Sequence, residues 1–233
     1  MKQYLFVGDL HRDLKAALYA IQWAASIGAE ILQVGDWGFL PDGLRLQDHT
    51  GALSEGLVRY GVRMRFIDGN HDNHPLLFTY SAGEDNVAPN LTYQPRGSLH
   101  IDEDGTRFVF LGGAPSIDKD DYVPGKGWFP EEEITVEQGW LAQSHGSADV
   151  LVTHDAPVLP PYSKPLPPSW EFTKRANHSR EIIAIVTEAL QPRILTHGHY
   201  HRPYEGRYKN TTIIGLGQNG LSLWKEMCFP WHA

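Results

Sequence analysis

The sequence predicts an α/β fold whose first half contains a parallel sheet, because apolar runs typical of strands alternate with apolar residues at helical spacing. Residues 3–8 form a short apolar run typical of a buried strand, and residues 12–27 repeat apolar side chains as an amphipathic helix does. Two further buried strands are expected at 31–35 and 62–67, separated by a helix over 44–60. Strands joined through helices in this order lie parallel, with right-handed crossover connections.

Short strands dominate the chain after residue 90. Helices are expected at 131–144 and 178–190, and the turn at Asn210 predicts a hairpin. The sequence shows no internal repeat, and we expect residues 1–233 to form a single domain. The strands predicted in this part of the chain are residues 91–94, 98–102, 107–111, 149–153, 193–196, 203–208, 211–215 and 221–224.

Two segments do not fit this pattern of strands and helices. Residues 112–133 are too polar and glycine-rich for regular structure before the acidic run Glu131–Glu133, which suits the N-terminus of the following helix. Residues 156–170 contain six prolines, which excludes a helix or a central strand. This proline-rich segment follows His154 directly, so we expect it either to close over a site as a lid or to pack on the surface as a loop.

The composition bounds the class of protein and its partners. With 20 basic and 28 acidic residues the net charge is −8, which argues against a basic groove for long nucleic acids. The single cysteine, Cys228, excludes an internal disulfide and a cysteine-built metal site, and we interpret it as a small apolar packing residue. The sequence contains no charged-then-apolar leader and no apolar run of membrane-spanning length. We therefore expect a cytoplasmic protein without a membrane partner, and the sequence leaves its oligomeric state open.

Residues that can bind metal ions follow five predicted strands, at the point where each strand ends. In open α/β sheets these ends face a common crevice where ligands bind. The mixture of carboxylate, carboxamide and imidazole donors suits Mn, Fe, Zn, Ni or Co better than Mg or Ca. Bound cations would also reverse the unfavourable effect of an acidic protein on a phosphate substrate. The motifs are Gly8-Asp9-Leu10-His11, Gly35-Asp36, Gly69-Asn70-His71-Asp72, Thr153-His154 and His197-Gly198-His199-Tyr200-His201.

These five motifs, in this order and spread over residues 8–201, resemble those of the calcineurin-like metallophosphoesterase superfamily. The resemblance implies a four-layer α/β/β/α sandwich of two mixed sheets. It also implies two divalent metal ions, with Mn favoured, that activate a hydroxide for the hydrolysis of a phosphate ester. By the same resemblance, Asp9, His11 and His201 would hold the first ion, Asn70, His154 and His199 would hold the second, and Asp36 would bridge the two.

The resemblance also suggests roles for residues that are not metal ligands. His71, beside Asn70, resembles the general acid that protonates the leaving oxygen. Asp72 would either orient His71 or solvate the loop, and His197 is expected to support the ligands without binding an ion. The candidates for substrate binding are Lys119, Trp128 and Arg12; for Lys119 and Trp128 the alternatives are a salt bridge and a packing role.

Three departures from other branches of the superfamily bear on the substrate. Phosphoprotein phosphatases and dinucleoside polyphosphate hydrolases usually read Gly-Asp-x-His-Gly, Gly-Asp-x-x-Asp-Arg-Gly and Gly-Asn-His-Glu. Here Arg12 replaces the first glycine, Trp37 and its successors replace the arginine-containing motif, and Asp72 replaces the glutamate. We interpret these changes as favouring a phosphodiesterase of small molecules such as cyclic nucleotides. The main alternative is a phosphomonoesterase or protein phosphatase, and a nuclease or a non-catalytic scaffold fits the sequence less well.

Overall fold

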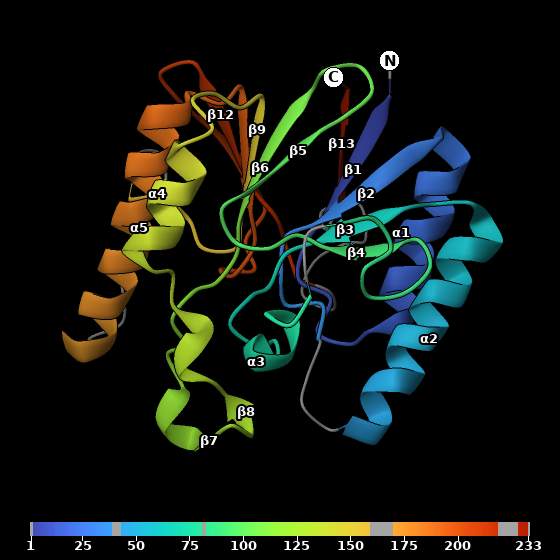
Figure 1. The fold of residues 1–233 in the computed structure, drawn as a ribbon, viewed down its shortest axis with the longest axis horizontal. Coiled ribbons are helices and arrows are strands. Elements are labelled where there is room, and N and C mark those ends of the chain that lie inside the picture. The colour runs from blue at the N-terminus through green and yellow to red at the C-terminus, as the bar shows by residue number, and fades with distance from the viewer. Residues whose placement is uncertain (1, 39–42, 81–82, 159–169, 219–227, 233) are drawn as a thin grey trace.

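Two β-sheets lie face to face and form the inner layers of the fold, and pairs of helices cover their outer surfaces (Figure 1). The structure is a computed structural model that describes residues 2–38, 43–80, 83–158, 170–218 and 228–232. Among the described helices, none combines the length and the apolar character needed to cross a bilayer.

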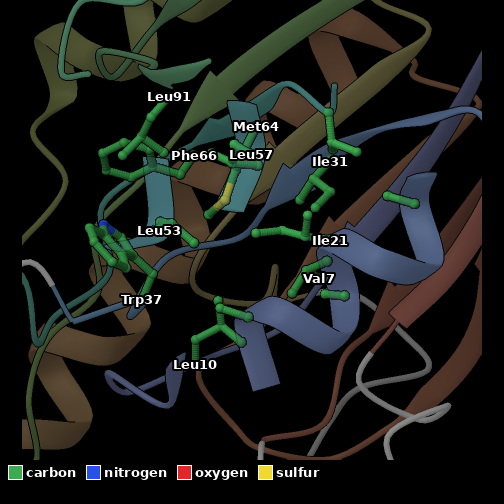
Figure 2. Packing of buried hydrophobic residues seen from close by; sticks show 14 of the residues in the cluster. Val7, Leu10, Ile21, Ile31, Trp37, Leu53, Leu57, Met64, Phe66 and Leu91 are labelled. Atoms are coloured by element: carbon green, nitrogen blue, oxygen red, sulfur yellow. The ribbon is translucent and has the colours of Figure 1, made fainter. Parts of the chain in front are cut away.

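The first sheet contains the parallel strands predicted in the N-terminal half. Its strand order is β13-β1-β2-β3-β4, with β13 antiparallel to β1 and the other neighbours parallel. Apolar side chains from the two covering helices and from this sheet form one core cluster (Figure 2). The elements are β1 (Gln3–Val7), α1 (Leu14–Ile27), β2 (Ala29–Gln33), α2 (Gly43–Tyr60), β3 (Met64–Phe66), β4 (Leu91–Tyr93) and β13 (Cys228–His232).

The second sheet is also mixed, with antiparallel strands at its two edges. Its order is β11-β12-β10-β9-β6-β5, in which β12, β10, β9 and β6 run parallel. The hairpin predicted around Asn210 is confirmed as the antiparallel pair β11–β12. The elements are β5 (Ser98–Ile101), β6 (Arg107–Leu111), α4 (Val136–Gln143), β9 (Val150–Thr153), α5 (Trp170–Leu190), β10 (Ile194–His197), β11 (Tyr204–Tyr208) and β12 (Thr211–Gly215).

Three apolar clusters hold the four layers together. The cluster between the sheets contains Phe6 and Val34 from the first sheet and Phe110 and Val152 from the second. The other two clusters bury the outer face of each sheet under its helices. Because side chains of a strand alternate between its faces, most of the central strands contribute to a cluster on both sides. The expected four-layer α/β/β/α sandwich of two mixed sheets is therefore confirmed.

Several element boundaries differ from the sequence expectation. The helix α5 begins at Trp170, earlier than the predicted residue 178, and β13 was not predicted. The predicted strand 221–224 and most of the proline-rich segment, 159–169, lie outside the described residues. The segment 112–133 was expected to lack regular structure, but it contains short helical turns and strands. The short helix α3 was not predicted either. These short elements are α3 (His74–Leu77), η1 (Lys119–Asp121), β7 (Val123–Pro124), β8 (Gly127–Trp128) and η2 (Pro130–Glu132).

The helix predicted at 131–144 starts later than expected, and the acidic run is not its N-terminus. Pro130–Glu132 forms a short 3₁₀ turn, and Glu132 is buried rather than exposed to solvent. The helix α4 begins at Val136, where Thr135 and Gln138 form a capping box. The Thr135 hydroxyl accepts from the Gln138 backbone N–H while the Gln138 side chain accepts from the Thr135 N–H, which satisfies two donors that the helix leaves free.

Replacement of Thr135 tests this helix start. We expect Thr135→Ala to lower the free energy of unfolding by about 1 kcal/mol, because the cap loses its side-chain acceptor. Glu131→Ala is the matched control: Glu131 is exposed outside α4, so its loss should change the stability by less than the error of a urea titration. A larger loss for Glu131→Ala than for Thr135→Ala would support the original boundary instead.

Candidate metal centre

The predicted ligands come together at one end of the sandwich, where parallel strands of both sheets finish. Asp9 follows β1, Asp36 follows β2 and Asn70 follows β3, so the first sheet supplies the carboxylates and the amide. His154 follows β9, and the loop after β10 carries two further histidines, His199 and His201. The site is therefore built across the two sheets.

The first group of side chains contains Asp9, His11 and His201. The Nε2 atom of His201 lies 3.0 Å from Asp9 Oδ2 and 3.2 Å from His11 Nε2. The other carboxylate oxygen, Asp9 Oδ1, is buried and has no hydrogen-bond partner among the described residues. A buried charged oxygen without a partner is costly unless a cation binds it. One ligand atom from each of the three residues lies within 4.8 Å of the other two, which fits a metal ion.

The second group contains Asn70, His154 and His199. The oxygen Asn70 Oδ1 lies 2.9 Å from His199 Nδ1 and 3.1 Å from His154 Nε2. Asp36 lies between the groups, because its Oδ2 atom is 3.3 Å from His154 Nε2 and 3.9 Å from His11 Nε2. The carboxylate is thus placed where it can be shared, and the oxygen and nitrogen donors suit the transition metals expected from the sequence.

The backbone around the ligands adopts conformations that L-residues rarely take. The φ angles are 42° at His11, 55° at Asp36, 65° at His199 and 52° at His201. Left-handed conformation at such residues costs of order 1 kcal/mol or more each, and it is retained when the surroundings impose it. Gly69 is needed for close approach: a Cβ there would lie 2.0 Å from Asp36 Oδ1.

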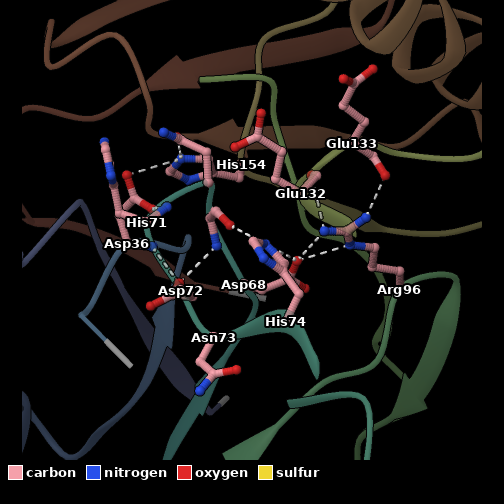
Figure 3. Close-up of polar contacts among 12 residues, drawn as sticks. Asp36, Asp68, His71, Asp72, Asn73, His74, Arg96, Glu132, Glu133 and His154 are labelled. Atoms are coloured by element: carbon pink, nitrogen blue, oxygen red, sulfur yellow. Dashed lines mark hydrogen bonds and ion pairs between the residues drawn. The ribbon is translucent and has the colours of Figure 1, made fainter. Parts of the chain in front are cut away.

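Asp72 joins the two loops that carry Asp36 and Asn70. Its Oδ2 atom accepts from the backbone N–H groups of Asp36, at 3.0 Å, and Gly69, at 2.8 Å. Its Oδ1 accepts from Gly38 N at 3.2 Å. Figure 3 shows Asp72 beside Asp36 and His71. The carboxylate is fully buried, so the expectation that it solvates the loop is wrong. The backbone N–H of His71 donates to Asp36 Oδ1 at 2.8 Å. This bond links His71, the candidate general acid, to the loop that carries Asp36.

Burial and mutual charge set the protonation of these groups. Burial lowers the pKa of His11 and lowers that of His199 well below the ordinary value, so both imidazoles are neutral and able to bind a cation at neutral pH. Asp36 and His154 titrate as a pair. Burial alone would raise the pKa of Asp36 and lower that of His154, but their attraction reverses both shifts. The pKa of Asp36 falls well below its usual range, and that of His154 rises to about 10.

His197 supports the loop from behind the cluster. It is buried, its Nε2 atom lies 2.6 Å from the Tyr204 hydroxyl, and burial lowers its pKa to about 4. Nδ1 lies 3.0 Å from the carbonyl oxygen of Gly198, the residue before His199. A neutral imidazole in this position can brace the loop without facing the ligand atoms.

The three candidates for substrate binding lie on three different segments of the chain. Arg12 follows His11, and its Nε atom donates to the carbonyl oxygen of Gly38 at 3.2 Å, so the side chain packs on the Asp36 loop. Lys119 begins η1 and Trp128 ends β8, and both side chains are half-buried. Their part in substrate binding stays a prediction.

Sequence reasoning missed a group of polar residues behind Asn70. Ser116, Glu132 and Arg175 connect this ligand to α5, and Arg96 joins Asp68 to the segment around Glu132. One signal in the sequence pointed to Ser116, since it follows the predicted strand at 107–111 as the ligands follow theirs. Glu132 was not singled out, because the run Glu131–Glu133 is typical of the solvent-exposed N-terminus of a helix.

Comparison with known proteins identifies the family. The calcineurin-like phosphoesterase family matches residues 3–203, which is most of the chain, and the protein therefore belongs to this family. Members of the family generally depend on two metal ions, in agreement with the candidate Asp/His groups described above. No match is found among curated proteins.

Solved structures share the fold at low sequence identity. The chain is similar to TT1561 of Thermus thermophilus, with 13% identity, a TM-score of 0.61, and coverage of 93% of this chain and 89% of the other. It is also similar to GAP50, described as the anchor in the inner membrane complex of Plasmodium, with 13% identity and a TM-score of 0.55. That similarity covers 95% of this chain and 73% of GAP50. At these identities the similarity concerns the fold.

The raised pKa of His154 predicts that metal binding releases a proton. In the metal-free protein His154 is protonated below about pH 10, and an imidazole must be neutral to bind a metal ion. Binding at pH 7 should therefore release about one proton from His154, and the affinity should weaken as the pH falls. Calorimetry in two buffers of different ionisation enthalpy measures this release. The same titration of His154→Ala should show no such proton release. Wild-type protein that binds metal at pH 7 without releasing a proton would contradict the assignment of His154 as a metal ligand.

Proposed function

We propose that this protein hydrolyses small phosphodiesters, such as cyclic nucleotides, with two divalent metal ions. The observation that carries the proposal is the position of the Asp36 carboxylate between the two groups of ligand atoms. Asp9, His11 and His201 would hold one ion, Asn70, His154 and His199 the other, and Asp36 would contact both. When bound, two such ions make a water molecule acidic enough to attack phosphorus near neutral pH and neutralise charge on the phosphate.

The protein's own residues would orient the ester and supply a proton. His71 follows the ligand Asn70, is partly exposed, and its ring lies 5.5 Å from that of His11 between centroids. An imidazole N–H at this edge of the site can donate a proton to the leaving oxygen as its bond to phosphorus breaks. The hydrogen bond from the His71 backbone to Asp36 would hold His71 at a fixed position relative to the shared carboxylate.

The residues after Asp36 favour the proposal that the substrate is a diester and not a monoester. Trp37 occupies the position after Asp36, and its ring is buried against Phe66 at 5.9 Å between centroids, so it provides no cationic group. The guanidinium of Arg12 contacts the carbonyl oxygen of Gly38 in the same loop. A monoester carries up to two negative charges on its phosphate and gains most from an arginine clamp. A diester carries one charge, which two metal ions alone can neutralise.

Removal of His71 tests the role of general acid. We expect His71→Ala to lower kcat by roughly 10²–10⁴ for diesters with poor leaving groups, because the leaving oxygen then departs unprotonated. Activated aryl esters should lose less, and the metal content should not change. His178→Ala, which removes an exposed histidine of α5, is the matched control and should leave kcat unaltered. Equal losses on both kinds of substrate would remove His71 from this role.

A comparison of esters tests the substrate class. At the same pH and metal concentration, we expect kcat/KM for a bis-aryl phosphate or a 2′,3′-cyclic nucleotide to exceed that for the matching monoester. This ratio measures the stabilisation of the transition state relative to free enzyme and substrate. The opposite order by tenfold, about 1.4 kcal/mol, would assign the protein to the phosphomonoesterases. Metal-loaded protein with no activity on either ester would contradict the proposed reaction as a whole.

A further inference from the structure

A chain of buried hydrogen bonds leads from Asn70 to a carboxylate outside the metal centre. The amide nitrogen Asn70 Nδ2 donates to Ser116 Oγ at 3.1 Å. The Ser116 hydroxyl in turn donates to Glu132 Oε2 at 2.5 Å, and the Ser116 backbone N–H donates to Glu132 Oε1 at 2.8 Å. We propose that Ser116 and Glu132 are positioning residues that hold the Asn70 amide with its oxygen toward the metal site. This inference rests on the proposed two-metal function.

The direction of these hydrogen bonds follows from the number of protons available. Burial raises the pKa of the Glu132 carboxyl, but the two hydrogen bonds from Ser116 and the guanidinium of Arg175, whose Nη2 atom lies 2.5 Å from Glu132 Oε1, act in the opposite direction and favour the ionised carboxylate. An ionised carboxylate only accepts, so the single hydroxyl proton of Ser116 must be donated to Glu132. The Ser116 oxygen then has only lone pairs left and accepts from the amide N–H of Asn70.

This arrangement matters because an amide has two chemically different ends. Asn70 Oδ1 points at the ring nitrogens of His154 and His199, where the second ion would bind. If the amide were rotated by half a turn, its NH₂ group would face the cation and no lone pair would be available. The hydrogen bond to Ser116 opposes this rotation, since the amide oxygen would then face an oxygen that has no proton to donate.

A rigid frame holds Glu132 in place. The backbone carbonyl oxygens of Glu132 and Glu133 accept from Arg96, at 3.0 Å and 2.7 Å. Arg96 also donates to Asp68, two residues before Asn70, at 2.8 Å and 2.5 Å (Figure 3). Arg96, Asp68 and Glu132 are all buried. The ligand and the carboxylate that orients it are therefore tied to each other twice, through Ser116 and through Arg96.

Titration of the metal-free protein with Mn²⁺ tests the inference without relying on catalysis. We expect Ser116→Ala to weaken one of the two sites by about 10–100-fold, as for other groups that orient a metal ligand, and to leave the other site unchanged. Ser54→Ala is the matched control, because Ser54 is also buried and its hydroxyl donates to a backbone oxygen, of Pro89, at 2.8 Å. This control should keep both affinities. If Ser116→Ala unfolds, Ser116→Cys keeps the volume with weaker hydrogen bonding and should show the same selective loss.

A double-mutant cycle with Asn70→Asp separates positioning from general support. A carboxylate presents an oxygen in either orientation, so Ser116→Ala in the Asn70→Asp background should change the affinity by less than about threefold. An equal loss in both backgrounds, or unchanged affinity in folded Ser116→Ala or Ser116→Cys protein, would overturn the inference. Wild-type protein that binds no second ion would instead contradict the proposed function, so the two failures can be told apart.

Discussion

Asp36 is buried between two groups of imidazoles, on a residue whose backbone is in the left-handed conformation with φ 55°. Its side chain accepts from His71 N and contacts His154, while its backbone N–H donates to Asp72. The close approach of Gly69 leaves no room for another side chain beside it. A carboxylate is stable in such a place only when positive charge surrounds it, and in the metal-free protein the protonated His154 partly supplies that charge. The proposed ions would complete it.

The packing of the two sheets against each other sets the distances between Asp36 and the other candidate ligands. Asp9, Asp36 and Asn70 belong to the first sheet, and His154, His199 and His201 to the second, so neither sheet contains a whole site. The apolar cluster between the sheets sets their separation, and close-packed interiors resist small displacements. A hydrogen bond between the loops also fixes the positions of the ligands: His199 N donates to Asp9 Oδ2 at 2.9 Å, which joins ligands of the two sheets directly.

Local periodicity and the positions of strand ends predicted most of the strands and the convergence of the motifs, whereas the four layers were implied by the resemblance to the family. The sequence did not predict the start of α4, since Glu131–Glu133 resembles an acidic first turn whereas Glu132 is buried against Ser116 and Arg175. That pairing joins residues far apart in the chain, and no local pattern encodes it. The role of Asp72 was undecidable for the same reason, because its partners include backbone groups of the Asp36 loop.

The central claim is that two metal ions share Asp36. Loading the metal-free protein with Mn²⁺ and recording its electron paramagnetic resonance spectrum tests this claim directly, because ions roughly 3.5–4 Å apart that share a carboxylate have coupled electron spins. We expect the signal of isolated Mn²⁺ to be replaced by that of a coupled pair as the second ion binds. A spectrum that shows only isolated Mn²⁺ at saturation, or a protein that binds a single ion, would contradict it.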